Sequence, residues 1–365
     1  MKTIVFLCET VAFGVGRQFT DMICDLAITG TANLIVIVGP RRSDHHFIER
    51  LRVSGVNLYF LDMEREISWR DIQSMVRFYR IIASSGGASD SLLVGVSGKG
   101  GALARIASLV CGFRTVYIPH ASPIAMASGV KRQLYLGIER LLSLRCVHVV
   151  ATSKVEKALV ESFVDPLKIT VIRNGLAHAE IETLRERRTT HRLRTTLRLG
   201  FVGRLDEQKD PMKALHILRS ISSSIPVELM IYGDGPLREK LQQAADELSV
   251  AVRFMGYKPF TEVCADFDIL LNTSRYEGSP YLFLEAAAAN LPVITTDVGG
   301  AAELQESGVP VLIIHHDNQV QEIVTFVKGA GLNREPDAKK ISATYTSKEM
   351  ASGYEELFER QIGTF

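Results

Sequence analysis

Two glutamates lie in a segment of otherwise mostly small or apolar residues, which reads SRYEGSPYLFLEAAAAN from Ser274 to Asn290. A carboxylate that is removed from water is costly unless hydrogen-bond donors surround it. We therefore expect both carboxylates to accept hydrogen bonds from hydroxyl groups: Glu285 from the diol of a ribose, and Glu277 from a sugar. The alternative is that Glu277 is a loop surface residue and that Glu285 is a charge favoured by the dipole near a helix N-terminus.

A cationic loop, FVGRLDEQKDP, precedes a predicted helix that begins near Pro211. Gly203 lets the backbone turn closely, and Arg204 and Lys209 can reach the same anion from this loop. A planar guanidinium and a compact ammonium suit a diphosphate, whose oxygens are carried on two phosphorus atoms. The alternative is a surface network of ion pairs among these cations and the neighbouring Asp and Glu residues.

A helix N-terminus is predicted beside the two glutamates. The run PYLFLEAAAA is typical of a helix, with Pro280 at its first position and Ser279 as its cap. The free backbone N–H groups from Ser279 to Leu282 would form an anion site. We expect Arg204, Lys209 and these N–H groups to converge on one diphosphate.

Apolar, β-rich runs alternate with helical patterns along the chain. Continuous apolar strands separated by helices indicate parallel sheets that are covered on both faces. Two doubly wound α/β units are therefore expected, one after the other. Strands are expected at 2–8, 33–40, 56–61, 91–96, 114–119 and 148–153, and in the second unit at 197–204, 227–235, 252–257, 268–274, 292–297 and 309–314. In such sheets ligands bind beyond the carboxyl ends of the strands, so the expected site is a cleft between the two units.

The chain has 365 residues, too many for one ordinary core, which favours two domains. The basic, polar segment 184–198 is expected to be an interdomain connection or an exposed helix. The final segment has a helical pattern of apolar residues at Met350, Tyr354, Leu357 and Phe358. We divide the chain into an N-terminal acceptor-binding domain, 1–175, a C-terminal nucleotide-sugar-binding domain, 176–345, and a terminal helix, 346–365, that packs back on the N-terminal domain.

Taken together, GRLDEQKD and YEGSPYLFLEAAAANLPVITTDVGG resemble the second-domain signature of family 4 of the retaining glycosyltransferases. Either part alone is weak, whereas the spacing of the two glutamates joined to the Gly-Arg…Lys loop is specific. The resemblance covers the whole chain in layout and implies the GT-B fold, in which two Rossmann-like domains face each other across a cleft. It implies transfer of a sugar from a nucleotide-diphosphate donor to a hydroxyl acceptor, as in bacterial cell-surface polysaccharide, lipopolysaccharide or other glycoconjugate synthesis.

The resemblance also implies roles for the matching residues of the second domain. Arg204 and Lys209 match the pair that holds the donor diphosphate. Glu285 matches the glutamate on the nucleotide ribose, and Glu277 matches the acidic residue near the transferred sugar. The other donor-binding positions are Gly203, Gly233, Met255, Gly256, Tyr257, Gly278, Ser279, Pro280, Tyr281 and Leu282. Because 255–257 would hold the base through backbone atoms, the base is not identified, and UDP- and GDP-linked donors are both expected.

Three further positions are implied in the first domain. Gly14 and Gly16 end the loop before a helix expected from about Arg17, and they match the glycine motif that donor phosphate and acceptor approach. A simple turn into the helix is the alternative. A third glycine is missing at the dinucleotide-binding spacing, which disfavours a dehydrogenase. His120 directly follows a strand and matches the histidine that contacts the donor sugar, and Arg173 replaces the proline of the family's Pro-Asn-Gly segment.

Charge is distributed unevenly along a chain whose formal net charge is +1. Through Arg173 there are 21 Lys and Arg against 14 Asp and Glu, and after it there are 21 against 27. A basic N-terminal half could face anionic lipid or an anionic substrate, and ordinary scatter of surface charge is the alternative. The segment SGVKRQLYLGIERLLSLR carries Lys131, Arg132, Arg140 and Arg145 among Leu and Tyr. We expect it to lie on an anionic membrane, or else simply to pack on its sheet.

Several classes are disfavoured by composition. No stretch reaches the ~18 apolar residues that favour a membrane span, and the apolar N-terminal run is expected to be a buried strand rather than a signal peptide. Five cysteines without metal-type spacing indicate reduced thiols and a cytoplasmic protein, here peripheral on the inner face of the membrane. Few aromatic residues among the basic clusters and a net charge near zero disfavour nucleic acid as a partner.

No cofactor is expected, since the nucleotide sugar is a substrate, and the other expected partner is a glycan or lipid-linked glycan acceptor. Catalysis is expected from Arg204, Lys209, Glu277 and His120 without a metal ion. No Asp-x-Asp pair is positioned as a metal site, because Asp266 and Asp268 belong to a predicted helix–strand junction. Two other classes remain: a nucleotide-sugar epimerase or hydrolase on the same fold, and a noncatalytic partner subunit. The intact cations and glutamates argue against the second.

Overall fold

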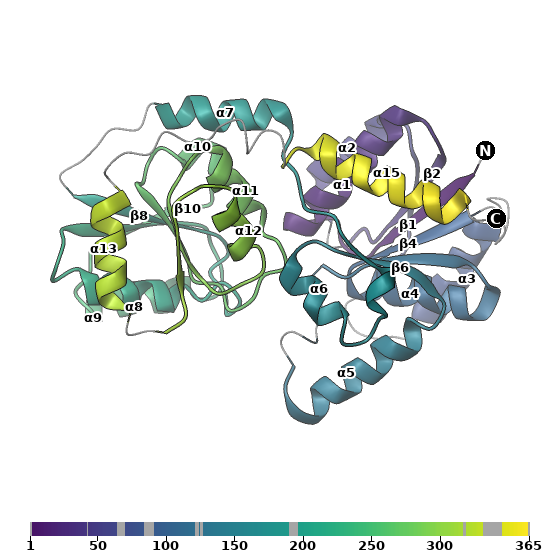
Figure 1. Cartoon of the computed structure of the whole chain (residues 1–365), viewed down its shortest axis with the longest axis horizontal. Coiled ribbons are helices and arrows are strands. Elements are labelled where there is room, and N and C mark those ends of the chain that lie inside the picture. Colours follow the sequence, from purple (N-terminus) through teal and green to yellow (C-terminus); the bar gives the residue numbers. More distant parts are fainter. Residues whose placement is uncertain are drawn as a thin grey trace. The chain divides into compact units, whose positions relative to one another are not determined.

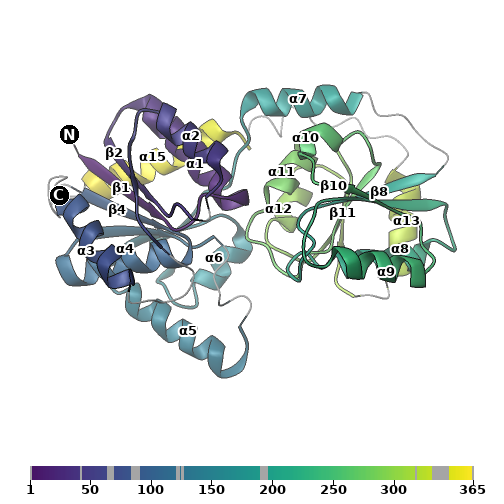
Figure 2. The same ribbon diagram turned by 180° about the vertical axis from the view of Figure 1, so that it is seen from behind.

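The computed structural model describes residues 2–41, 43–63, 70–83, 91–120, 124, 127–189, 196–316, 319–330 and 345–363. These form two compact units, Met1–Gly175 together with Ser347–Phe365, and Leu176–Thr346. The chain therefore returns to the unit in which it began. The helix α15 (Ser347–Gly363) lies along α1 (Phe13–Thr29) in both views (Figures 1 and 2).

The described part of the first unit contains a seven-stranded parallel sheet in the order β3-β2-β1-β4-β5-β6-β7. The strands are β1 (Thr3–Cys8), β2 (Asn33–Val38), β3 (Asn57–Phe60), β4 (Ser91–Val96), β5 (Arg114–Ile118), β6 (Cys146–Ala151) and β7 (Ile169–Val171). The other helices are α2 (His45–Val53), α3 (Arg70–Ala83), α4 (Ser97–Cys111), α5 (Gly129–Leu142), α6 (Lys154–Val160) and the 3-10 turn η2 (Pro166–Lys168).

The described part of the second unit contains a six-stranded parallel sheet in the order β10-β9-β8-β11-β12-β13. Its strands are β8 (Leu197–Val202), β9 (Val227–Tyr232), β10 (Val252–Gly256), β11 (Ile269–Asn272), β12 (Val293–Thr296) and β13 (Val311–Ile314). Its helices are α7 (His178–Thr189), α8 (Pro211–Ile221), α9 (Arg238–Glu247), α10 (Phe260–Val263), α11 (Tyr281–Ala288), α12 (Ala301–Glu306) and α13 (Val320–Ala330).

Alternation along the buried strands supplies a core on each face of each sheet. In β1, Ile4 and Phe6 pack with α1, α2 and α15, whereas Val5 and Leu7 pack with α3 and α4. In β9, Met230 packs with α10 and α11, while the residues on either side of it face α8, α9 and α13. Strands buried on both faces need apolar residues at every position, which is why these strands appear as continuous apolar runs in the sequence.

The prediction of two Rossmann-like parallel-sheet domains is confirmed. Each of the twelve expected strands is present, and β7 was not expected from the sequence. The helix expected from about Arg17 in fact begins at Phe13. Of the segment 184–198, the first part completes α7, residues 190–195 lie outside the described residues, and β8 follows.

Both sheets reverse their strand order beside their first strand. In the first sheet β1 lies between β2 and β4, and in the second β8 lies between β9 and β11. Loops that leave two such neighbouring strands lead to opposite faces of the sheet, so a crevice opens between them at the carboxyl edge. The loops after β8 and β11 carry Arg204, Lys209 and Glu277, which are predicted to act.

Candidate functional site

The two loops at the reversal point of the second sheet are tied together by hydrogen bonds. The Thr273 hydroxyl, just after β11, donates to the carbonyl groups of Lys209 and Asp210 at 3.1 and 2.8 Å. The Arg275 backbone N–H donates to the Gln208 carbonyl at 2.8 Å. These bonds fix the loop after β8 against the loop after β11, and so set the separation of the side chains that they carry.

Lys209 and Glu277 meet across these two loops. The Lys209 ammonium donates to Glu277 Oε1 at 2.5 Å, and the two side chains are only 19% and 9% exposed. The lysine methylenes lie over Gly203, where a Cβ atom would be 3.6 Å from Lys209 Cδ. An ammonium has three N–H donors and Glu277 takes one of them. The pair therefore holds a cation at the crevice that can still donate to an anion.

Arg204 is placed differently from Lys209. Its exposed guanidinium pairs with Asp206 Oδ2 at 2.8 Å and donates to Gln208 Oε1 at 2.9 Å. Nearby, Arg275 pairs with Glu207 and Asp210 at 3.1 and 3.0 Å. The surface network of ion pairs that the sequence left open is thus present around this loop, beside the Lys209–Glu277 pair.

The N-terminus of α11 differs from its prediction by one residue. Pro280 is the N-cap in an extended conformation, and the helix begins at Tyr281 with no side-chain cap. Ser279 therefore lies one position too early to cap, and the prediction of a Ser279 cap is wrong. The N–H groups at the start of α11 are left without a side-chain cap. Glu285 lies half-buried in the second turn, and Leu282 is half-buried in the first.

Close backbone approaches explain several glycines at the carboxyl edge of this sheet. A Cβ atom on Gly233 would lie 1.8 Å from the Gly203 carbonyl oxygen, and the Gly233 N–H donates to the Gly256 carbonyl at 2.9 Å. A Cβ atom on Gly299 would lie 2.2 Å from the Gly278 carbonyl oxygen. The loops after β8, β9, β10, β11 and β12 therefore touch through backbone atoms. At the end of β10, Met255 and Tyr257 are exposed to solvent.

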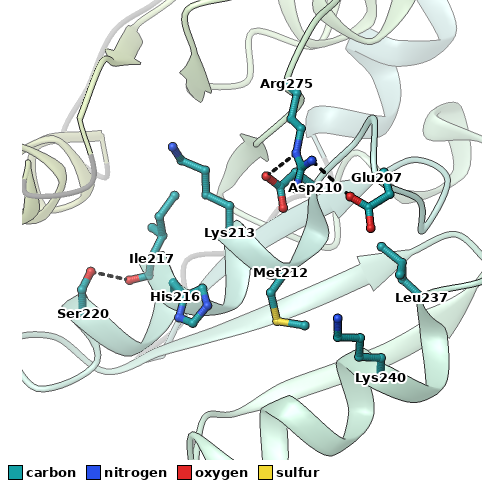
Figure 3. Close-up of a pocket in the computed structure, with 10 residues that line it drawn as sticks. All are labelled: Glu207, Asp210, Met212, Lys213, His216, Ile217, Ser220, Leu237, Lys240 and Arg275. Carbon is teal, nitrogen blue, oxygen red and sulfur yellow. Dashed lines mark hydrogen bonds and ion pairs between the residues drawn. The ribbon is translucent and has the colours of Figure 1, made fainter. Parts of the chain in front are cut away.

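A hollow of about 630 Å³ lies between α8 and the start of α9, and Glu207 and Asp210 of the loop after β8 contribute to its lining (Figure 3). Its lining includes Glu207, Asp210, Lys213, Lys240 and Arg275, and the ion pairs of Arg275 form one wall. None of the residues predicted to bind the donor lines it. The hollow nevertheless shares Asp210 with the loop that carries Lys209.

In the first unit, the two predicted glycines belong to the first turn of α1 rather than to a loop before it. A Cβ atom on Gly16 would lie 2.5 Å from the backbone carbonyl carbon of Val11, whereas one on Gly14 would meet nothing within 4 Å. Gly16 therefore allows the helix to begin directly against the chain after β1. Phe13, the first helical residue, has φ of 53°, a conformation that is uncommon for a bulky side chain.

His120 directly follows β5 and Pro119, with φ of 48°. Its Nε2 lies 3.0 Å from Oε1 of Gln18 in α1, and the Gln18 amide group donates to the Tyr354 hydroxyl in α15 at 3.0 Å. Burial lowers the pKa of His120 below its ordinary value of 6.5, although the Glu156 carboxylate acts to raise it. Burial therefore favours the neutral form of the His120 imidazole.

Neither Gln18 nor Tyr354 was expected from the sequence to be a partner of His120, and a contact at the reversal point of the first sheet was not expected either. Glu9, in the loop after β1, accepts a hydrogen bond from the Lys99 backbone N–H at 2.8 Å, in the first turn of α4. The glycine-rich run SGKGG directly after the predicted strand 91–96 was the available signal for this helix start. No pattern in the sequence links Gln18 to His120 or to Tyr354.

Asp266 and Asp268, between α10 and β11, both accept hydrogen bonds from neighbouring residues of the second unit. Asp266 Oδ2 accepts from the Tyr232 hydroxyl at 2.8 Å, and Asp268 Oδ2 accepts from the Arg198 N–H at 2.7 Å. Within the described ranges, no group of three or more His, Cys, Asp or Glu side chains is arranged to hold a metal ion. Among the helices of the described residues, none has the length and apolar character needed to cross a membrane.

Comparison with known proteins agrees with the two-domain layout. Residues 13–175 match the model of the glycosyl transferase 4-like domain, and residues 196–328 match the model of glycosyl transferases group 1. The Escherichia coli O-antigen biosynthesis glycosyltransferase WbnH is 23% identical over 363 residues, which cover 98% of this chain and 99% of WbnH. The Mycobacterium tuberculosis (strain H37Rv) glycogen synthase is 33% identical over 147 residues, 39% of this chain and 34% of that protein.

Solved structures share the GT-B fold expected from the sequence. Anabaena HepE in complex with UDP and glucose superimposes with a TM-score of 0.75 at 18% identity, covering 99% of this chain and 100% of HepE. The lipopolysaccharide outer core galactosyltransferase WaaB, in its apo form, gives a TM-score of 0.74 at 17% identity over 98% of this chain and 99% of WaaB. At these sequence identities the similarity shows a shared fold and nothing more.

Proposed function

The chain belongs to the glycosyltransferases that join a 4-like first domain to a group 1 second domain, and on this premise we propose that it transfers a sugar from a nucleotide-diphosphate donor to a hydroxyl acceptor. Its relatives support a place in polysaccharide synthesis. The observation that carries the proposal is the Lys209–Glu277 pair at the reversal point of the second sheet. The pair puts a cation beside a carboxylate that can accept hydrogen bonds from hydroxyl groups, at the position where such sheets bind ligands.

The reaction needs charge stabilisation at the departing diphosphate. Lys209, the uncapped N-terminus of α11 and Arg204 are the donors available for it on this domain. Arg204 would exchange its contacts with Asp206 and Gln208 for phosphate oxygens. Donors that are already held in place stabilise the developing charge without reorganising at the moment of reaction.

We assign the sugar to Glu277 and the ribose to Glu285. Glu277 Oε1 is taken by Lys209, so its other oxygen accepts from a sugar hydroxyl. The same ion pair disfavours Glu277 as a covalent nucleophile, since its charge is already stabilised. Retention of configuration then follows a front-side path, in which the leaving phosphate helps to deprotonate the acceptor.

Metal independence is part of the proposal, because cationic side chains take the place of a metal at the diphosphate. Asp266 and Asp268 are already hydrogen-bonded to Tyr232 and Arg198. Turnover is expected to survive EDTA. Loss of turnover in EDTA that magnesium restores would refute this part.

The donor is tested with a panel of UDP-, GDP- and ADP-sugars, scored by thermal stabilisation and by slow donor hydrolysis. A UDP-sugar is the first candidate, because HepE, a structural neighbour, is described in complex with UDP and glucose. One nucleotide class should stabilise the protein. Full-rate turnover of the donor without any acceptor would favour the epimerase or hydrolase, and no stabilisation by any member would contradict the proposal.

The acceptor is proposed to be a glycan or lipid-linked glycan that reaches the enzyme at an anionic membrane surface. Helix α5 supports this, because within it only Leu136 is buried. Val130, Leu134, Ile138 and Leu141 are 87%, 61%, 44% and 59% exposed, at spacings that place them along one side of the helix. In both views α5 lies at the edge of the first unit, beside α4 (Figures 1 and 2).

Basic residues accompany this apolar side. Lys131 and Arg140 on α5 and Arg145 just after it are exposed, and Arg132 is partly exposed. Each basic residue near an anionic bilayer contributes about 1 kcal/mol of attraction. This combination favours a cytoplasmic enzyme that is peripheral on the inner face of the membrane.

Flotation with phosphatidylglycerol-containing vesicles tests the membrane surface. The protein should float in a salt-sensitive manner, and the variant Leu134→Ser/Leu141→Ser should not. Ile28→Ser, which changes an exposed apolar residue on α1, is the control and should float as the wild type does. Absence of salt-sensitive flotation of the wild type would count against the proposal.

A further inference from the structure

A buried chain of hydrogen bonds joins the C-terminal helix to the histidine predicted to meet the donor sugar. Tyr354 in α15 accepts from the Gln18 amide at 3.0 Å, and Gln18 Oε1 lies 3.0 Å from His120 Nε2. Gln18 and Tyr354 are both completely buried. Buried polar groups that satisfy one another in this way fix a single arrangement, because any partner that turns away is left unpaired.

The direction of the hydrogen bonds decides the state of the imidazole. When the Gln18 amide nitrogen donates to Tyr354, its oxygen faces His120 and can only accept. The proton must then be on Nε2 of His120, which leaves Nδ1 with a lone pair. A flipped amide would reverse this and place the proton on Nδ1, so the position of the imidazole proton reports the orientation of Gln18.

We propose that Gln18 and Tyr354 are positioning residues for His120, which hold its imidazole as the neutral Nε2–H tautomer and so present Nδ1 as a hydrogen-bond acceptor for a hydroxyl of the donor sugar. The role of Nδ1 rests on the proposed function. The hydrogen bonds from Tyr354 through Gln18 to His120 rest on the structure. These bonds give the C-terminal segment a part in the site: α15 supplies the anchor at the end of the chain, 336 positions from Gln18.

The surroundings agree with a neutral imidazole. Burial lowers the pKa of His120, and the charged group that acts against this is Glu156, in the first turn of α6. The Glu156 carboxylate is held by the Thr152 N–H and hydroxyl, both at 2.7 Å. Burial also raises the pKa of Tyr354, which keeps its hydroxyl protonated. Above its lowered pKa, His120 is uncharged and its tautomer is set by Gln18.

Tyr354→Phe is the most selective test, because it removes only the hydroxyl and keeps the ring that packs on Phe358. Gln18→Met is the second variant, and it removes the amide at a similar size. Tyr59→Phe, an exposed position on β3, is the matched control. Thermal unfolding checks that each variant is folded. The full-length protein is labelled with 15N-histidine, and the His120 signals are identified by their loss in His120→Asn.

In the wild type at pH 8, the 15N shifts and couplings of His120 should show a proton on Nε2 and an unprotonated Nδ1. Tyr354→Phe and Gln18→Met should give a mixture of tautomers and should lower kcat/KM by up to about 100-fold, the effect of a misplaced reacting group. The control should change neither. A wild-type proton on Nδ1, or a tautomer that is unchanged in both variants, would overturn the inference.

The tautomer is measured without substrate, which separates this inference from the proposed function. If the tautomer behaves as expected but no nucleotide sugar is turned over by the wild type, the proposed function fails and the assignment of Nδ1 to a donor sugar fails with it. If turnover is present and the tautomer does not respond, the proposed function stands and the positioning chain is refuted.

Discussion

Replacing Lys209 by methionine removes one cation from the crevice of the second sheet at nearly constant side-chain size. Its ammonium is held at 2.5 Å by Glu277, and its methylenes lie over Gly203. The donor is thus preorganised, and losing one such donor to a transition-state charge lowers kcat by about 10²–10³-fold, or ~2.7–4 kcal/mol. Turnover of the nucleotide sugar selected by the donor panel is the assay.

The same substitution also has a cost in stability, which must be separated from catalysis. It leaves the Glu277 carboxylate, 9% exposed, without its cation, and such an unpaired group costs about 1–3 kcal/mol. Adding Glu277→Gln removes the stranded charge. The double variant should therefore recover most of the lost unfolding free energy in urea, but none of the lost turnover.

Two outcomes would refute this reasoning. The first is turnover of Lys209→Met within threefold of the wild type, which would show that the ammonium is not a transition-state donor. Alternatively, the double variant could regain wild-type turnover, which would mean that Lys209 acts only by neutralising Glu277. Lys240→Met, in the neighbouring hollow of Figure 3, is the charge-matched control and should turn over normally.

Gly233→Ala should destabilise the second domain by about 1–3 kcal/mol or prevent its folding, since a Cβ atom would lie 1.8 Å from the Gly203 carbonyl oxygen; urea unfolding checks this. Gly137→Ala in the exposed helix α5 is its counterpart and should stabilise by about 0.5–1 kcal/mol, because nothing lies within 4 Å of the added methyl group. Glu139→Gln should destabilise the first domain by about 3–5 kcal/mol, because it leaves the fully buried Arg105 without its carboxylate at 2.6 Å. An unchanged melting temperature of Glu139→Gln would show that Arg105 is satisfied without it.

Much of the fold could be predicted because its strands are buried on both faces. Such strands are continuous apolar runs, and twelve were located from these alone. β7 was missed because Ile169–Val171 is only three residues long and too short to show a pattern. The start of α1 was misplaced because glycines disfavour helices. In the structure Gly16 is nevertheless helical, and its lack of a Cβ atom allows the first turn of α1 to lie directly against Val11.

The part of the candidate site that could be predicted consists of residues in short loops directly after strands. Lys209 and Glu277 belong to loops whose positions follow from strand order, and the structure brings them together. The partners of His120 were not predictable. Gln18 lies 102 positions before His120, and Tyr354 lies 336 positions after Gln18. Gln18 and Tyr354 meet because α15 packs along α1. Long-range burial of this kind leaves no local pattern in the sequence.

The proposed role of the cations of the second domain is to hold the diphosphate of the donor. It is tested most directly by calorimetric titration of the wild type and of Arg204→Met/Lys209→Met with the diphosphate and the monophosphate of the nucleoside that stabilises the protein. The wild type should bind the nucleoside diphosphate at least tenfold more tightly than the monophosphate, a difference of roughly 1.4 kcal/mol in binding free energy. The double variant should bind the diphosphate and the monophosphate with equal affinity. If the double variant keeps the full preference for the diphosphate, these cations do not hold it.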